Sequence, residues 1–138
     1  MTKISCLLNI LKDIFRLKGA KGEDSFTNSV ALELKALSVE GRLNCVWFHV
    51  PNETVVKSKE DIIRLRKKAS LGMIPGAPDF VFVDKSKTIF AELKTKTGHL
   101  SENQKLFQQW SEYAGVAYYV IRSEDELKMI LKKEGMLK

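Results

Sequence analysis

The apolar residues of the chain recur at two spacings, one typical of helices and the other typical of strands. Near the start they recur every three or four residues, which predicts an amphipathic helix. A secretion signal is the less favoured interpretation, because charged residues interrupt the run. The helix could pack on the rest of the chain or form a dimer seam. The residues of this stripe are Ile4, Leu7, Leu8, Leu11, Ile14 and Phe15.

Helical spacing predicts three more helices, over residues 23 or 25 to 38, 101–114 and 123–133. The last two open with capping boxes, in which a Ser side chain and a Glu or Gln side chain three residues later bond the first backbone N–H groups. These boxes are Ser101 with Gln104, and Ser123 with Glu126. The expected inner positions are Phe26, Val30, Leu34 and Leu37 in the first helix, and Leu106, Phe107, Trp110 and Tyr113 in the second.

Short runs rich in β-branched and aromatic residues predict about four strands. They cover residues 45–50, 79–83, 88–93 and 116–121. Residues 57–68 read as a helix or a loop, and the Gly/Pro-rich residues 71–78 as a turn. The predicted fold class is α/β, with a mixed sheet of about four strands flanked by helices. After the N-terminal helix, the expected order is α-β-(α)-β-β-α-β-α.

The second and third strands are separated by Asp84-Lys85-Ser86-Lys87 and predict a β-hairpin. A two-residue loop, the commonest hairpin length, pairs residue i with residue 171 − i and places Asp79 directly opposite Glu92. Because side chains alternate between faces, both acids share one face with Lys94, and the other face is apolar.

Two carboxylates opposed in this way, with Cβ atoms roughly 4.5–5.5 Å apart, destabilise the sheet unless something neutralises them. Mg²⁺ prefers oxygen ligands and is commonly held by one or two carboxylates and substrate phosphates. Alternatively, Asp79 is a turn acid, and Glu92 and Lys94 form a surface pair. Both faces of the hairpin are apolar, which favours the metal site because an unpaired buried charge is costly. A one-residue bulge would break the register.

Positive charge is concentrated in one segment of the chain. The formal net charge is +6, and residues 57–68, with six basic and two acidic residues, account for +4 of it. This stretch predicts contacts with nucleic-acid phosphates, although a solvated helix face is the alternative. The candidate residues are Arg64, Arg66, Lys67 and Lys68, with Lys96 after the hairpin.

Length and composition indicate one compact domain. The chain has 138 residues, of which 44% are apolar. Its two cysteines, Cys6 and Cys45, have no metal-type spacing and suggest neither a zinc site nor a disulfide framework. No apolar run approaches the roughly 18 residues of a membrane span. We expect a cytoplasmic protein without a membrane partner, with an N-terminal helix and linker at 1–20 and a domain at 21–138.

The acidic hairpin resembles the PD-(D/E)xK nuclease signature. Pro78-Asp79 is followed after 12 residues by Glu92-Leu93-Lys94. A longer ordered set of segments is similar to the virus-type replication-repair nuclease (VRR-NUC) family: "HVPNE", "GMIPGAPDF", "AELK", "LSENQKLF" and "GVAYYVIRSEDEL". The resemblance covers roughly residues 23 to 131. It implies a restriction-endonuclease-like core and Mg²⁺- or Mn²⁺-dependent cleavage of DNA, in a small phage-like form that can act as a homodimer on branched DNA.

The resemblance also implies roles for individual residues. Asp79 and Glu92 match the metal ligands, with the backbone carbonyl of Leu93 as a further ligand. Lys94 matches the lysine that stabilises the attacking hydroxide or the developing charge. Gln104 matches a glutamine that could orient water, and its alternative role is to close the helix start.

The family's first helix supplies another acid, and two residues are candidates. Glu23 lies close to the direction of the predicted inner stripe, whereas Glu33 lies nearer its margin. We favour Glu23 as a metal ligand, although it could be an ordinary first-turn acid. Thr27 and Asn28 stand where a glutamine often follows this acid, so the match of this helix is incomplete.

Two other classes of function fit the same residues. One is a nucleic-acid-binding module that keeps the fold without cutting, against which the intact Asp79, Glu92 and Lys94 argue. The other is a metal-free structural domain in which Lys94 neutralises both acids.

Overall fold

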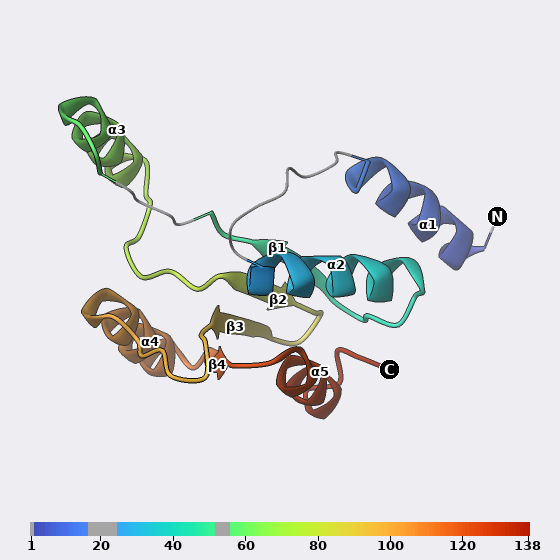
Figure 1. Ribbon diagram of the computed structural model, residues 1–138. Helices are drawn as coiled ribbons and strands as arrows, with labels where there is room; N and C mark the ends of the chain where they lie inside the picture. Colours follow the sequence, from blue (N-terminus) through green and yellow to red (C-terminus); the bar gives the residue numbers. More distant parts are fainter. Residues whose placement is uncertain (1, 17–24, 52–55) are drawn as a thin grey trace.

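The computed structural model describes residues 2–16, 25–51 and 56–138 and centres on a four-stranded sheet (Figure 1). The strands lie in the order β1-β2-β3-β4. β2 is antiparallel to both β1 and β3, and β4 runs parallel to β3. The predicted mixed sheet of four strands flanked by helices is therefore confirmed. The strands are β1 (Val46–His49), β2 (Phe80–Val83), β3 (Thr88–Leu93) and β4 (Ala117–Ile121).

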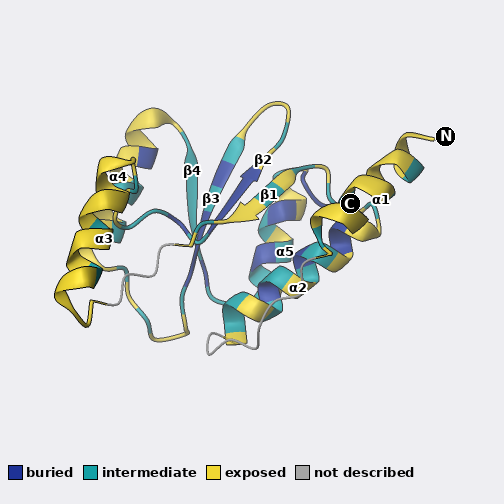
Figure 2. Ribbon diagram, turned by 90° about the horizontal axis from the view of Figure 1, so that it is seen from above, coloured by how far each residue is buried: buried dark blue, intermediate teal, exposed yellow. Residues whose placement is uncertain are grey.

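The described residues form five helices, which lie on both sides of the sheet. Figure 2 shows α2 and α5 on one side, and α4 on the other side with α3. The basic stretch, which the sequence left as helix or loop, is a helix whose first turn is capped by Ser58 accepting from Asp61 N–H. The helices are α1 (Lys3–Ile14), α2 (Ser25–Val39), α3 (Lys59–Ser70), α4 (Glu102–Ala114) and α5 (Glu124–Lys133).

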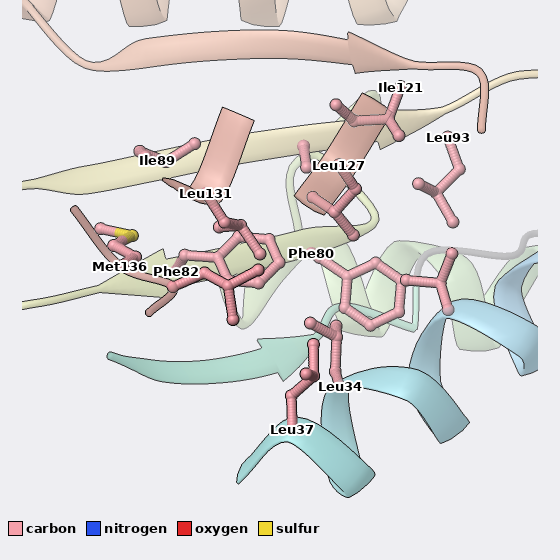
Figure 3. Packing of buried hydrophobic residues seen from close by; sticks show 13 residues of the cluster. Leu34, Leu37, Phe80, Phe82, Ile89, Leu93, Ile121, Leu127, Leu131 and Met136 are labelled. Carbon is pink, nitrogen blue, oxygen red and sulfur yellow. The ribbon is translucent and has the colours of Figure 1, made fainter. Parts of the chain in front are cut away.

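The main hydrophobic core fills the space between the sheet, α2 and α5 (Figure 3). Alternate strand residues supply one side of it, and Phe80 and Phe82 are completely buried. The predicted inner stripe of α2 is confirmed, with Val30, Leu34 and Leu37 buried and Phe26 packed at the margin. This arrangement leaves the opposite sheet face to residues that include Glu92.

The β2–β3 hairpin has the predicted register. Phe80 pairs with Ala91, and Val83 with Thr88, so paired residue numbers sum to 171. The side chain of Asp84 stabilises the tight loop by accepting from the backbone N–H groups of Ser86 and Lys87. No bulge interrupts the pairing of β2 with β3. The open end of the hairpin therefore brings Asp79 next to Glu92.

The predicted orientation of α4 is wrong. Of the four expected inner residues, Phe107 is partly buried, whereas Leu106, Trp110 and Tyr113 are 60%, 57% and 93% exposed. The side facing the sheet consists instead of Gln104, Phe107, Gln108 and Ser111, with Ser111 buried. Polar contacts at the start of the helix, described below, fix this orientation and leave an apolar stripe in solvent.

The N-terminal helix lies against the domain without burying any of its residues. It contacts α2, and the ring of Phe15 lies 5.9 Å from that of Trp47. Ile4, Ile10 and Ile14 remain half or more exposed. Among the described residues, no helix combines the length and apolar character needed to cross a membrane.

The second predicted capping box is only half formed. Ser123 caps α5 by accepting from Glu126 N–H. The carboxylate of Glu126 reaches one residue further and accepts from the backbone N–H of Arg122 instead of Ser123.

Candidate metal centre

Asp79 and Glu92 meet where β2 begins and β3 ends. Asp79 immediately precedes β2, and its Oδ2 accepts a 2.7 Å hydrogen bond from the backbone N–H of Leu93. Its own carbonyl accepts from Val50 N–H, which ties the acid to the end of β1. Glu92 projects from the central strand β3 and is only 3% exposed. The tight loop and unbroken register therefore place one partly buried and one buried carboxyl group side by side.

The two oxygens of Glu92 have different surroundings. Oε1 accepts a 2.7 Å hydrogen bond from Nε2 of Gln104, and Nζ of Lys94 lies 3.8 Å from it. Oε2 is buried and has no hydrogen-bond partner among the described residues. Buried polar atoms are nearly always paired with protein, water or an ion. When both acids are ionised this oxygen lacks a positive partner, and a cation bound by Asp79 and Glu92 would supply one.

Burial raises the pKa values of both acids. The pKa of Glu92 rises to about 8, because burial and the negative charge of Asp79 both disfavour ionisation. Burial also raises the pKa of Asp79, although the Leu93 N–H and the nearby charges of His49 and Lys94 oppose the shift. A divalent cation would reverse this balance by favouring both ionised carboxylates. The donor set consequently suits a metal better than it suits two unneutralised charges.

Gln104 joins the start of α4 to the acidic pair. Its Oε1 accepts from Ser101 N–H at 2.9 Å, and its backbone N–H donates to the Ser101 hydroxyl, which completes the predicted capping box. Its Nε2 donates to Glu92. The predicted role of Gln104 in closing the helix start is therefore confirmed, whereas its role in orienting water stays a prediction. Its geometry makes it a group that holds the Glu92 carboxylate in place.

A close backbone approach supports this contact. Gly76, in the Gly/Pro turn before β2, has φ +82° and lies against the start of α4. A Cβ atom at this position would lie 2.3 Å from the carbonyl oxygen of Asn103 and 2.7 Å from the backbone nitrogen of Gln104. Only glycine fits this conformation without displacing the turn or the helix.

His49 lies next to the acids, although the sequence gave it no role. Its Nδ1 lies 2.7 Å from the carbonyl oxygen of Asp79, and its ring lies 5.1 Å from that of Phe80. A carbonyl oxygen can only accept, so Nδ1 donates this hydrogen bond. The sequence placed His49 at the end of a predicted strand. It did not show that this strand pairs with β2, which brings His49 next to Asp79.

Tyr118 is a second residue that the sequence did not indicate. It pairs with Phe90 across the parallel strands β3 and β4, which places it on the same sheet face as Glu92. Its hydroxyl is buried and has no hydrogen-bond partner among the described residues. Burial and the charges of Glu92 and Asp79 raise the pKa of this hydroxyl. It is therefore a neutral donor close to the acidic pair.

The acids line a cavity of about 610 Å³ that one of the predicted phosphate-binding residues also lines. Arg66 of α3 lines this cavity. The other predicted phosphate-binding residues, Arg64, Lys67, Lys68 and Lys96, are exposed and do not line it. Arg64 lies 3.4 Å from Asp61. Thr27 of α2 also lines the cavity, so the start of this helix faces the acids.

The two candidates for the first-helix acid have different outcomes. Glu23 lies outside the described residues. Glu33 forms an ion pair of 2.8 Å with Lys128 of α5 and is not among the residues that line the cavity. Within residues 2–16, 25–51 and 56–138, no group of three or more His, Cys, Asp and Glu side chains could hold a metal. The described side-chain carboxylates at the site are therefore Asp79 and Glu92.

Comparison with known proteins adds no relative: no family model matches the chain, and neither the curated proteins nor the solved structures give a significant match.

Proposed function

We propose that the protein is a Mg²⁺- or Mn²⁺-dependent DNA endonuclease of the PD-(D/E)xK type, similar to the VRR-NUC family. The observation that carries this proposal is the pairing of Asp79 with Glu92 at a cavity that Arg66 also lines, with Oε2 of Glu92 buried and unpartnered among the described residues. When bound, the metal would polarise a phosphodiester and lower the pKa of a coordinated water.

The residues of the chain have separate tasks in this proposal. Asp79, Glu92 and the backbone carbonyl of Leu93 hold the metal, with Glu23 as the further acid suggested by the sequence. Gln104 keeps the Glu92 carboxylate in position through its 2.7 Å hydrogen bond. Lys94 is 19% exposed, so it can stabilise the negative charge that develops as phosphate is attacked.

The basic residues orient the DNA. Arg66 supplies a positive charge at the cavity. The exposed residues Arg64, Lys67, Lys68 and Lys96 extend the positive charge beyond it. Contacts of this kind bind the phosphate backbone without reading sequence. They are consistent with selection by DNA structure, such as branches or junctions, in replication, repair or recombination.

One observation favours a second candidate, a non-cleaving DNA-binding module on the same fold. Nζ of Lys94 lies 3.8 Å from Glu92, so the lysine partly neutralises the acids without any metal. Calorimetry with Mn²⁺ in the presence of DNA separates the candidates. A nuclease binds the metal through Asp79 and Glu92, whereas a salt-bridged binding module gives no metal-binding heat.

The direct experiment is a cleavage panel with linear duplex, single-stranded, flap and four-way-junction DNA, each with Mg²⁺, Mn²⁺ or EDTA. We expect metal-dependent cleavage that Asp79→Asn abolishes. Glu33→Gln is the matched control, because it neutralises an acid that is ion-paired away from the cavity. Cleavage in EDTA, or equal cleavage by wild type and Asp79→Asn, would overturn the proposal.

A further inference from the structure

The exposed apolar stripe of α4 borders a groove that lies next to the acidic cavity. The groove has a volume of about 180 Å³ and is lined by Ile74, Pro75, Asn103, Leu106, Phe107 and Trp110. Pro75 and Asn103 also line the acidic cavity. A ligand that crosses Pro75 and Asn103 would thus reach from the acidic cavity to the groove beside Trp110.

The rings beside the groove form a supported chain. Trp110 is 57% exposed, and its ring meets Phe107 edge to face at 5.6 Å. Phe107 in turn meets Phe90 of β3 edge to face at 5.5 Å. Trp110 is therefore attached to the same strand that carries Glu92, while much of its surface remains in solvent. Exposed aromatic rings of this kind are the usual platforms for unpaired nucleobases.

We propose that the groove binds an unpaired nucleobase, which stacks on Trp110 while the adjoining phosphate lies in the acidic cavity. This inference rests on the proposed function, because it needs nucleic acid in that cavity. The shared lining residues Pro75 and Asn103, the positive charge of Arg66 in the adjoining cavity and the small volume of the groove favour a base over a protein partner. It assigns the groove to one unpaired nucleobase next to the phosphate in the cavity.

Trp110 can report stacking directly. The chain contains two tryptophans, so Trp47→Phe leaves Trp110 as the only indole, and thermal melting checks that this variant folds. In EDTA, where cleavage is absent, we titrate it with an oligothymidylate and with an abasic oligonucleotide of the same length. The oligothymidylate should quench Trp110 fluorescence, and the abasic strand should not. Equal quenching by both strands would overturn the proposal.

Affinity provides the second measurement. Trp110→Ala should weaken binding of the oligothymidylate roughly five- to 150-fold, the loss expected for one stacked base. It should leave binding of the abasic strand unchanged, and Trp110→Phe should restore most of the loss. Tyr113→Ala is the matched control, because Tyr113 is exposed on the same helix and does not line the groove.

The outcomes separate this inference from the nuclease proposal. Base-dependent binding through Trp110 without cleavage in any metal supports the groove and removes the nuclease. Metal-dependent cleavage with unchanged oligothymidylate affinity in Trp110→Ala supports the nuclease and removes the groove. If Trp110→Ala instead converts a dimer to a monomer in sedimentation velocity and base-dependent binding is absent, the stripe is an interface between copies, which also overturns the inference.

Discussion

The carboxyl groups of Asp79 and Glu92 cannot both ionise in the metal-free protein without a penalty, because burial and the charge of Asp79 raise the pKa of Glu92. Asp79→Asn removes one charge and keeps an oxygen that can accept from Leu93 N–H. The substitution should therefore leave the melting temperature of the metal-free protein unchanged or raise it. It should also abolish stabilisation by Mg²⁺, which for a single site is about 2.7 kcal/mol at 100 times Kd. Melting curves with and without metal test both expectations.

The control for this experiment is Glu33→Gln, which should keep the metal-linked rise in melting temperature. Unfolding of Asp79→Asn without metal would show that the acid is structural. A rise with Mg²⁺ equal to that of wild type would remove Asp79 from the metal site.

The raised pKa of Glu92 predicts how the stability of the metal-free protein varies with pH. The folded protein retains the Glu92 proton up to about pH 8, whereas the unfolded chain releases it near 4.5. Between these values the folded state binds more protons, so the free energy of unfolding should fall as pH rises. Asp79 contributes in the same direction, since burial also raises its pKa. Saturating Mg²⁺ should oppose this fall, because the metal binds the ionised carboxylates.

Denaturant unfolding of wild type and Glu92→Gln across pH 5–8 checks this prediction; this window lies within the range set by the pKa shift. The variant should show a flatter dependence, because the titrating group is gone. The same slope in both proteins would mean that Glu92 ionises normally in the folded state.

Residue positions could be predicted wherever local rules fix them. Asp79 and Glu92 are close in sequence, and a two-residue loop with period-2 alternation is enough to oppose them. His49 and Tyr118 reach the site only through the pairing of β1 with β2 and of β4 with β3. These pairings join distant segments, and no short-range spacing in the sequence encodes them.

At the scale of elements, α4 shows how a few polar contacts can override an apolar pattern. Periodicity predicted that Leu106, Trp110 and Tyr113 would face the sheet, yet all three are exposed. The Gln104–Glu92 hydrogen bond fixes the rotation of the helix about its axis, and the close approach of Gly76 fixes the position of its start. Sequence periodicity contains neither interaction, so it could predict the helix but not its orientation.

The close approach of Gly76 gives a prediction for the contact between the turn and α4. Gly76→Ala would add a Cβ atom 2.3 Å from Asn103 O in a backbone with φ +82°. The turn or the start of α4 must move, which should destabilise the protein by roughly 1–3 kcal/mol. Displacement of Gln104 should also weaken metal binding, which calorimetry with Mn²⁺ measures.

Gly72→Ala is the matched control. Gly72 also has a positive φ, +99°, but no atom of the described part of the chain lies within 4 Å of the added Cβ. It should therefore show the conformational penalty alone and retain metal binding. Equal effects of the two substitutions on metal binding would mean that contact with α4 does not position the site.

The molecule as a whole places its functional candidates apart from its main hydrophobic core. The core fills one side of the sheet, against α2 and α5, whereas α3 and α4 lie on the other side (Figure 2). Residues of α3 and α4 line the acidic cavity together with Thr27 at the start of α2. The strand patterns predicted the mixed sheet, because the strands are runs of apolar residues that are buried in the core. The placement of the basic helix at the cavity depends on a long connection between β1 and β2, which local patterns do not describe.

The position of Arg66 leads to a prediction about how DNA binding depends on salt. Arg66 lines the cavity, so each DNA molecule that enters should release counterions there. Binding of duplex DNA without divalent metal should lose about one unit of its log–log salt slope in Arg66→Gln, to a similar extent for different sequences. Lys128→Gln makes the same charge change at a residue paired with Glu33 on α5, and should leave the slope unchanged. Equal slopes for the two variants would indicate that DNA affinity depends only on the net charge of the protein. That result would remove Arg66 from the proposed DNA-binding surface.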